Sequence, residues 1–463
     1  MENNTLNPRV ALIWTDKAYP EFPYDENSAL HKALKDLFKA LGVPPENPFK
    51  DSIKPGETAL IKPNWVMHTH PNEKNLDCLI SHTSLIRYLI DFLAKAMQGQ
   101  GTIVLGDSPL QSCDLPKLLD RSHIHEVLTN ARQQYPQIQF VIEDWRLTHY
   151  KNKPIPLDDF GNIQSSKHQI IDLKQKSFLE DIRDYSNQFR ITCYKPSLLK
   201  KHHAPGKHEY FIANRVFDAD FIINLPKMKT HIKAGLTGAL KNLIGINGHK
   251  EYLPHHIKGP YFKGGDNYLM PNKIREYHEN VYDYFWEHSS EMSSLKRNLF
   301  SFWLNVLLVL SFILGKEIIS AGQWRCNETI WRTTLDLNQI LYFFGPKRPR
   351  KILTILDGII AGERQGPLCP QAKKIGVLIG GENPAHVDAI AAQLMGYNVS
   401  RIPTVYHALY HRNSCFGGTS LEELSIFSNT QGPELSKISF FDLPNLHFQK
   451  PLFWVGASLN DKD

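Results

Sequence analysis

The sequence predicts an α/β fold, with parallel or mixed sheets that carry helices on both faces and with an aromatic-rich helical elaboration. Three observations predict it. Short apolar runs without polar alternation are typical of strands buried on both faces. Helical periodicity accompanies these runs, and strands that alternate with helices favour parallel sheets. The composition, 42% hydrophobic and 22% charged over 463 residues, is that of a globular protein and excludes a disordered chain.

Six apolar runs are the expected strands, and each leads into a polar cluster. In chain order they are residues 10–13, 59–61, 103–105, 221–223, 352–356 and 377–379, accompanied by helical patterns at 28–41, 84–97 and 385–395. Parallel sheets bind ligands beyond the carboxyl ends of their strands. We therefore expect Asn64, Asp107, His231 and Asp357 to line one cavity. The alternative is that these clusters are ordinary turns.

The length predicts about two or three domains, and we expect four stretches along the chain. Residues 1–150 form an α/β block, and residues 151–250 continue it with a loop rich in lysine and glycine. Residues 251–345 form the helical, aromatic-rich elaboration, and residues 350–463 form a second α/β block and a tail.

Charge and cysteine content narrow the classes of function. Lysine and arginine number 53 against 47 acidic residues, an excess too thinly spread to predict a nucleic-acid partner. The six cysteines include no CxxC pair, so neither an iron–sulfur run nor a zinc ribbon is expected. Scattered thiols and an N-terminus without a signal-peptide pattern predict a cytoplasmic protein.

The strongest chemical signal is the segment 221–250, FIINLPKMKTHIKAGLTGALKNLIGINGHK. It contains five lysines and no acidic residue, so it needs an anion or a carboxylate from elsewhere in the chain. A glycine-rich turn at the start of a helix presents backbone N–H groups to phosphate or carboxylate. The alternative is that small residues allow close packing and the lysines are solvated. The predicted ligand-binding residues are Lys62, Asn64, Lys229, Lys233, Gly235, Thr237, Gly238 and Asn242.

The predicted catalytic residues are His231, Lys241, Asp107 and Asp357. His231 is the expected acid–base because an imidazole titrates in the range that suits this work. Lys241 would hold the anion, and Asp107 or Asp357 would be the partner carboxylate. His255 and His256 follow the lysine segment and are candidate metal ligands, although HExxH spacing is missing.

Five motifs in one order carry a resemblance to a known family. They are KPNW (62–65), GDSP (106–109), the central segment 223–248, ILDGIIAGERQGP (355–367) and NPAHVDAIAAQLMG (383–396). Together they resemble the family called domain of unknown function 362, over about residues 58–400. Many relatives carry a ferredoxin-like module, but this chain has no CxxC, so no iron–sulfur cluster is expected.

A more distant similarity is to the nickel-pincer lactate racemases. It rests on the order of His231, the glycine-rich turn and Lys241. The resemblance implies a lysine that holds a pyridinium cofactor, with histidines that assist at nickel and in proton transfer. A metal or a pyridinium-type cofactor is therefore a candidate for this protein.

The residues together predict an enzyme that binds a small anionic substrate or cofactor, of isomerase, racemase-like or oxidoreductase type. The alternative is a non-catalytic protein that binds an anion or sits as an accessory at a membrane surface. A third hypothesis, an electron-transfer component, is disfavoured by the cysteine pattern.

The segment 299–314, LFSFWLNVLLVLSFIL, has thirteen apolar residues among sixteen. As a helix it would be about 24 Å long, short of a hydrocarbon core of about 30 Å. We expect it either to pack on the aromatic region around Trp286 and Trp303, or to make a peripheral membrane contact. In the second case the protein would be membrane-associated, with Lys296, Arg297 and Lys316 at the lipid headgroups.

Overall fold

The computed structural model describes residues 6–150, 154–156, 163–165, 167–192, 195–315, 322–323, 326–345, 350–432, 434–452 and 454. Lys316, one of the basic residues expected to flank the apolar segment, lies outside the described residues.

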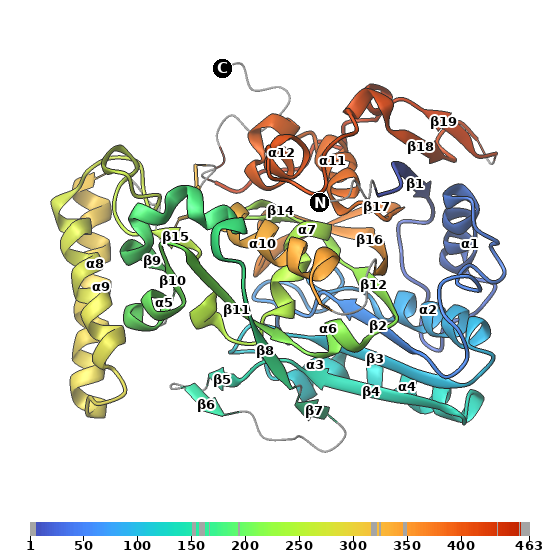
Figure 1. Cartoon of the computed structure of the whole chain (residues 1–463), viewed down its shortest axis with the longest axis horizontal. Coiled ribbons are helices and arrows are strands. Elements are labelled where there is room, and N and C mark those ends of the chain that lie inside the picture. Colours follow the sequence, from blue (N-terminus) through green and yellow to red (C-terminus); the bar gives the residue numbers. More distant parts are fainter. Residues whose placement is uncertain are drawn as a thin grey trace.

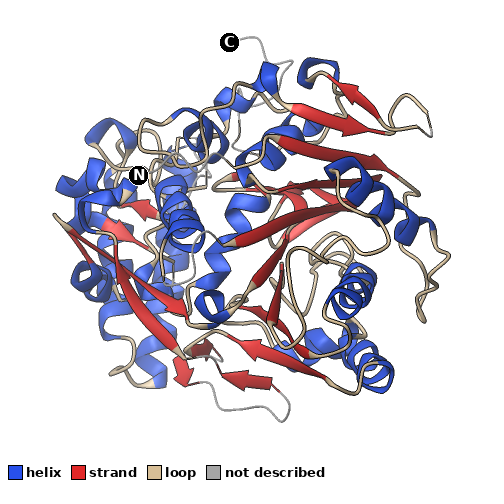
Figure 2. Ribbon diagram, turned by 45° about the vertical axis from the view of Figure 1, so that its right-hand side comes forward, coloured by secondary structure: helices blue, strands red, loops and turns tan. Residues whose placement is uncertain are grey.

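A twisted sheet forms the centre of the molecule (Figures 1 and 2). Its strand order is β19-β18-β1-β17-β16-β12-β2-β3-β4-β7, and β13 and β14 extend it beside β16. The strands are β1 (Arg9–Trp14), β2 (Thr58–Pro63), β3 (Gly101–Asp107), β4 (Ile138–Asp144), β7 (Ile163–Ser165), β12 (Phe221–Leu225), β13 (Lys227–His231), β14 (Gly235–Thr237), β16 (Lys351–Gln365), β17 (Cys369–Gly381), β18 (Ser425–Ser428) and β19 (Ser436–Ile438).

The sheet is mixed, with a parallel centre. β16, β12, β2, β3 and β4 run parallel to one another. β17 runs antiparallel to both β16 and β1, because the chain returns from β16 through a short turn instead of a crossover helix. The sheet joins strands from the two expected α/β blocks directly, since β1 pairs with β17 and β18.

The predicted two-sided burial of the strands is confirmed. Alternate residues of β1 belong to opposite cores: Val10 to one, Ala11 to the other. Leu60 and Ile61 of β2 divide in the same way. All six predicted strands and the three predicted helices are present, and the α/β fold class is confirmed.

Helices cover both faces of the sheet. One core holds residues of α1 (Ala29–Leu41), α2 (Thr83–Ala96), α3 (Leu115–Arg121) and α4 (Ile124–Gln134). The other holds residues of α6 (Arg215–Asp218), α7 (Ala239–Asn242), α10 (Ile330–Phe343), α11 (Pro384–Met395) and α12 (Pro403–Tyr410), with α5 (Pro196–His202) contributing Leu199.

Smaller sheets flank the main one. A three-stranded sheet contains β10 (His203–Ala204), β11 (Lys207–Ala213) and β8 (His168–Asp172). Two pairs complete the set: β5 (Thr148–Tyr150) with β6 (Pro154–Pro156), and β9 (Phe189–Arg190) with β15 (His256–Ile257).

The helical elaboration contains α8 (Lys273–His288) and α9 (Ser294–Gly315), which lie side by side at the edge of the molecule opposite α1 (Figure 1). α9 has 22 residues and is longer than the predicted 299–314, because Ser293 accepts the amides of Lys296 and Arg297 and starts the helix earlier. Within the described residues, no helix has the combination of length and apolarity that a bilayer crossing requires.

Candidate functional site

The carboxyl ends of β2, β3 and β12 meet at one edge of the sheet, because these strands are parallel neighbours. Lys62 and Asp107 stand at the ends of β2 and β3 and form a buried ion pair of 2.6 Å. Burial lowers the pKa of Lys62 and raises that of Asp107, and each partner opposes the other's shift. A Cβ on Gly245 would lie 2.8 Å from the Lys62 Nζ, so glycine is needed for this close approach.

An amide network continues from this pair. Asn64 Nδ2 donates to Asn242 Oδ1 at 3.0 Å, and Asn242 Nδ2 donates to Asn224 Oδ1 at 2.8 Å. Two polar atoms in the same region, Asn64 Oδ1 and Thr237 Oγ1, are buried and have no hydrogen-bond partner among the described residues. A buried polar atom without a partner is costly in a protein interior, so these two atoms are unfavourable in the ligand-free chain.

Asp357 belongs to a neighbouring cluster. Its Oδ2 accepts from Lys227 Nζ at 2.9 Å and from the amide of His82 at 3.0 Å. Its Oδ1 accepts from the Tyr19 hydroxyl at 2.6 Å. Both Asp357 and Lys227 are fully buried. The chain itself therefore satisfies both carboxylate oxygens, and the structure does not bring Asp357 into contact with Asn64, Asp107 or His231.

Lysines crowd together at the same edge of the sheet, and we define the Lys241 cluster as Lys229, Lys233, Lys241, His231 and His255. Burial, followed by the charges of Lys233, Lys250 and Lys62, lowers the pKa of Lys241 to about 7. Burial likewise lowers the pKa of Lys229 to about 7, and the charges of Lys227 and Lys241 act in the same direction.

Lys241 itself has no acidic counterpart among the residues that the structure describes. Its side chain is half-buried, and no hydrogen bond or ion pair joins its ammonium group to another described residue. Lys229 donates to the Leu79 carbonyl, which carries no formal charge. Uncompensated cations at low exposure are unfavourable, so the described residues leave the charge of Lys241 unbalanced.

His231 and His255 are held as complementary tautomers. His231 Nδ1 accepts the backbone amides of Lys233 at 3.0 Å and Ala234 at 3.2 Å, so a neutral His231 carries its proton on Nε2. His255 Nδ1 lies 2.7 Å from the Leu253 carbonyl, which can only accept, so the lone pair of His255 is on Nε2. Burial, followed by nearby lysine charges, lowers the pKa of both rings well below the usual range. Nε2 of His231 is thus a hydrogen-bond donor, and Nε2 of His255 is an acceptor.

The histidines that the structure describes do not assemble a metal site. The described residues contain no group of three or more histidine, cysteine, aspartate or glutamate side chains placed to hold a metal ion. His256 Nδ1 is buried without a hydrogen-bond partner among those residues. The interpretation of His255 and His256 as metal ligands therefore gains no support from the geometry.

The glycine-rich turn has a different arrangement from the predicted one. Gly235 and Thr237 form β14, and Gly235 adopts a φ of +82° that favours glycine. Directly after Gly238 in the sequence, the amides of Ala239 and Leu240 donate to the carboxylate of Asp388 at 2.6 and 3.0 Å. An internal carboxylate thus occupies the helix end that the sequence assigned to an external anion. Burial raises the pKa of Asp388 to about 7.

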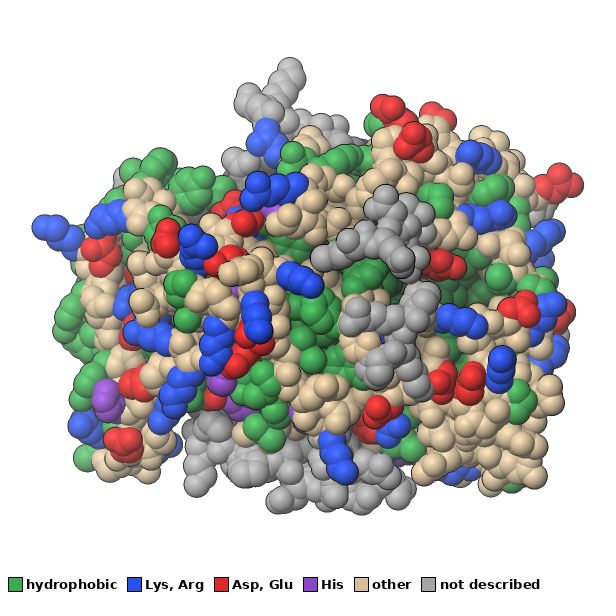
Figure 3. Space-filling view, in the orientation of Figure 1, with side chains coloured by type: hydrophobic (Ala, Val, Ile, Leu, Met, Phe, Trp, Pro, Cys, Tyr) green, Lys and Arg blue, Asp and Glu red, His purple; other side chains and the backbone are tan. Residues whose placement is uncertain are grey.

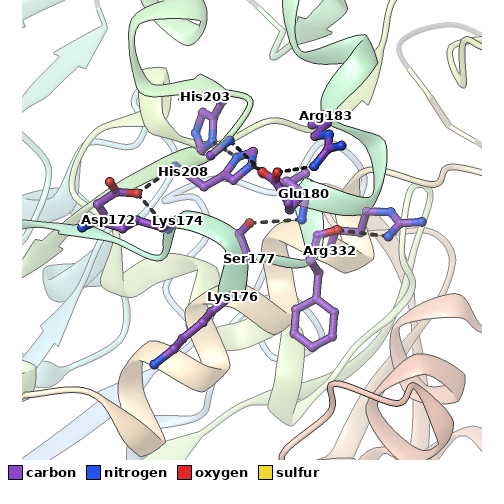
Figure 4. Close-up of polar contacts among 12 residues, drawn as sticks. Asp172, Lys174, Lys176, Ser177, Glu180, Arg183, His203, His208 and Arg332 are labelled. Carbon is purple, nitrogen blue, oxygen red and sulfur yellow. Dashed lines mark hydrogen bonds and ion pairs between the residues drawn. The ribbon is translucent and has the colours of Figure 1, made fainter.

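A second histidine cluster lies outside the predicted site (Figure 4). His208 Nε2 lies 2.9 Å from Glu180 Oε2, and Arg183 also pairs with Glu180. His203 Nδ1 lies 3.4 Å from His208 Nδ1, and His203 Nε2 contacts the Tyr252 carbonyl. All four ring nitrogens have partners within the chain, so this cluster ties β10 and β11 to neighbouring segments and leaves no nitrogen for a ligand.

A cavity of about 390 Å³ lies next to the Lys241 cluster. Its lining includes Thr192 and His256, and Lys233 Nζ donates to Thr192 Oγ1 at 3.4 Å. Lys241 and His231 are not among its lining residues. The opposite wall comes from α8 and α9, including Phe285 and Leu304.

Sequence reasoning missed Asp388, Lys227, Tyr19 and His82 as partners of predicted site residues. Lys227 and Asp388 stand inside motifs of the chain, but their partners, Asp357 and the amides of Ala239 and Leu240, are distant in sequence. Tyr19 stands in a polar segment without a recognisable pattern.

Comparison with known proteins adds one family match. Residues 184–393 match the family described as Domain of unknown function (DUF362), which is narrower than the resemblance predicted from the motifs. This region includes the Lys241 cluster, Asp357 and Asp388 but not Lys62 or Asp107. No curated protein matches the chain.

Among solved structures, a crystal structure of a protein from Thermotoga maritima shares 9% sequence identity with a TM-score of 0.34. The alignment covers 81% of this chain and 60% of that chain. A similarity this low carries no argument about fold or function. The comparisons supply no support for the similarity to lactate racemases.

Proposed function

We propose that this protein is an enzyme that binds a small anion, a phosphate or a carboxylate, at the Lys241 cluster. One observation carries the proposal: the half-buried Lys241 ammonium has no acidic partner among the described residues, while burial, followed by the charges of three other lysines, lowers its pKa. An anion would supply the missing negative charge and accept charge-assisted hydrogen bonds. Thr237 Oγ1 and Asn64 Oδ1, which have no hydrogen-bond partner in the described part of the chain, would orient polar groups of the same ligand.

The chemistry that this cluster suits is proton transfer on the bound anion. His255 would be the base through its Nε2 lone pair, and His231 would be the acid through its Nε2 proton. Lysine charges would stabilise the negative charge that develops when a proton leaves a carbon beside a carboxylate. Isomerisation or racemisation fits this pair directly.

An oxidoreductase reaction would need a redox cofactor in addition. Lys241, whose amine is partly unprotonated near pH 7, is the residue that would hold a pyridinium-type cofactor. When bound, such a cofactor would supply an electron-accepting ring. The same residues therefore leave both reaction classes within the proposal.

A second candidate function is a non-catalytic accessory protein that binds an anion at a membrane surface. Apolar side chains exposed along α9, among them Phe302 and Ile313, favour it. The two candidates differ in turnover, since only the enzyme changes the bound anion chemically.

Native mass spectrometry of the purified protein, together with its absorbance spectrum and a metal analysis, tests the proposal. We expect added mass from a small anion or cofactor in the wild type and in Lys117→Met, which alters an exposed lysine. The added mass should be lost in Lys241→Met. Chemical change of the released compound on incubation with fresh protein would indicate the enzyme, and unchanged release would indicate the accessory protein. Equal loading of Lys241→Met and wild type would contradict anion binding at this lysine.

A further inference from the structure

Helix α9 has two apolar sides, and within the part of the chain that the structure describes only one of them packs against other residues. Phe300 and Leu304 pack on α8 against Phe285 and Trp286. The side chains of Leu295, Leu299, Phe302, Val309 and Ile313 follow the helical spacing of four and three residues on another side, and all are exposed. Phe302 is 68% exposed and Ile313 62%. Hydrophobic side chains reach the surface along this edge of the molecule (Figure 3).

The exposed apolar arc is wide. At 100° per residue, Val309 and Leu314 mark its limits, and Trp303 and Leu310 fill it, so that it spans roughly 140° of the helix circumference. Ser301 and Asn305 stand on another side of α9, where they line the cavity of about 390 Å³ together with Leu304 and Leu308. With 22 residues, α9 presents this arc over a length of about 33 Å.

We infer that α9 is a docking surface for a lipid bilayer with anionic headgroups, on which the helix lies flat with its apolar arc in the interface. Amphipathic helices that lie in the interface plane bury one apolar face between headgroups and acyl chains. This inference does not depend on the Lys241 cluster.

Charge favours a membrane over another protein helix. α9 contains no aspartate or glutamate, and its basic residues, Lys296 and Arg297, stand at its N-terminal end. Lys296 is exposed and lies at the border of the apolar arc, where a lysine can reach an anionic headgroup. Helices that pair with a second helix usually carry charges of both signs beside a narrow apolar seam. The arc of α9 is wide and lacks acidic residues, so it does not fit that pattern.

Aromatic side chains agree with an interfacial position. Trp303 is 44% exposed beside Phe302. Trp rings are enriched where apolar and hydrated layers meet, since they combine an apolar body with an N–H donor. Trp303 is therefore a built-in reporter of contact with lipid.

Vesicle flotation tests the inference. The full chain is mixed with phosphatidylcholine vesicles that contain or lack phosphatidylglycerol. We expect flotation with both, and stronger flotation with phosphatidylglycerol. The double variant Leu299→Gln/Phe302→Gln should partition about tenfold more weakly, or worse, because two apolar side chains no longer enter the interface. A matched control, Phe441→Gln/Leu452→Gln, removes side chains of similar type and exposure far along the chain and should partition like wild type.

A second measurement needs no disruptive variant. Brominated lipids quench tryptophan fluorescence at close range, and this quenching should weaken in Trp303→Phe while binding persists. Absence of flotation at low salt would overturn the inference. Equal losses of vesicle binding in Leu299→Gln/Phe302→Gln and in its control would also overturn it. Fluorescence quenching that is unchanged in Trp303→Phe would do the same. A dimer of the wild type that Leu299→Gln/Phe302→Gln converts to monomer, without flotation of either, would make a second copy of the chain the occupant.

Discussion

Replacing Lys241 with methionine should make the ligand-free protein more stable and its anion binding weaker. Methionine keeps most of the apolar stem and removes the charge. Burial and neighbouring lysines lower the pKa of Lys241 from 10.5 to about 7. Taken in full, this shift costs the native state about 4 to 5 kcal/mol near pH 7. Because Lys241 is half-buried and part of the cost is screened, we expect a gain of about 2 kcal/mol in the free energy of unfolding.

The sign of the pH dependence follows from the same shift. Between about pH 7 and 10.5 the unfolded chain holds a proton on Lys241 that the native chain has lost. The loss of native-state stability caused by the Lys241 charge is complete below pH 7 and disappears as the pH rises towards 10.5. The wild type therefore gains stability over this window relative to Lys241→Met. Urea unfolding of both proteins at pH 6.5 and pH 9 therefore should give a larger difference at the lower pH.

Inorganic phosphate completes the test. It should stabilise the wild type, since a ligand that binds only the native state raises the free energy of unfolding. Loss of one charge-assisted hydrogen bond, about 1.5 to 3 kcal/mol, should weaken phosphate binding to Lys241→Met by roughly ten- to 150-fold. Sodium chloride at equal ionic strength and the variant Lys117→Met control for general salt effects. A destabilised Lys241→Met that phosphate stabilises as much as wild type would refute the reasoning and make Lys241 a structural residue.

Three further predictions concern neighbouring groups. Asp388→Ala should lower the free energy of unfolding by about 1 to 3 kcal/mol, because the buried amides of Ala239 and Leu240 lose their acceptor; Asp388→Asn, which keeps an acceptor oxygen, should cost less in the same urea titration. Asp357→Asn should lower the free energy of unfolding by about 3 to 5 kcal/mol, because Lys227 stays buried without its counter-charge. Adding Lys227→Met should restore part of this stability. An equal loss in the double variant would show that the ion pair is not the cause. Long-range proton–nitrogen NMR near pH 7 should show His231 neutral with its proton on Nε2 and His255 neutral with its proton on Nδ1; doubly protonated rings would contradict the assigned acid and base.

The fold could be predicted from the sequence because burial on two faces leaves a local signature. When neighbouring residues of a strand face opposite cores, both must be apolar, as in the pairs Val10 and Ala11 of β1 and Leu60 and Ile61 of β2. The ends of β2 and β3 share one edge, as expected of parallel strands, but Lys62, which was predicted to bind the ligand, pairs there with Asp107.

Other features depend on contacts that no local pattern encodes. Asp388 lies 149 residues from Ala239, so its hydrogen bonds to α7 exist only in the folded chain. The partners of Asp357 could not be predicted for the same reason, because Lys227 and Tyr19 reach its carboxylate from distant segments. The tautomers of His231 and His255 depend on single backbone contacts, which spacing between histidines does not reveal.

One of the two expectations for the apolar segment is confirmed, namely packing on the aromatic region, and the membrane contact stays a prediction. One side of α9 packs on the aromatic residues of α8, as one expectation had it, while Phe302 and Trp303 remain exposed on another. Periodicity could not separate the two sides because apolar residues occupy nearly the whole circumference of the helix.

Anion binding beside Lys241 is the central claim, and an anomalous-scattering experiment tests it most directly. Crystals of the protein soaked in bromide would reveal bound anions through their anomalous signal. The account predicts a peak within hydrogen-bonding distance of Lys241 Nζ in the wild type and none there in Lys241→Met. A wild-type crystal with bromide peaks only at other sites, and with a carboxylate of the chain itself paired to Lys241, would contradict it.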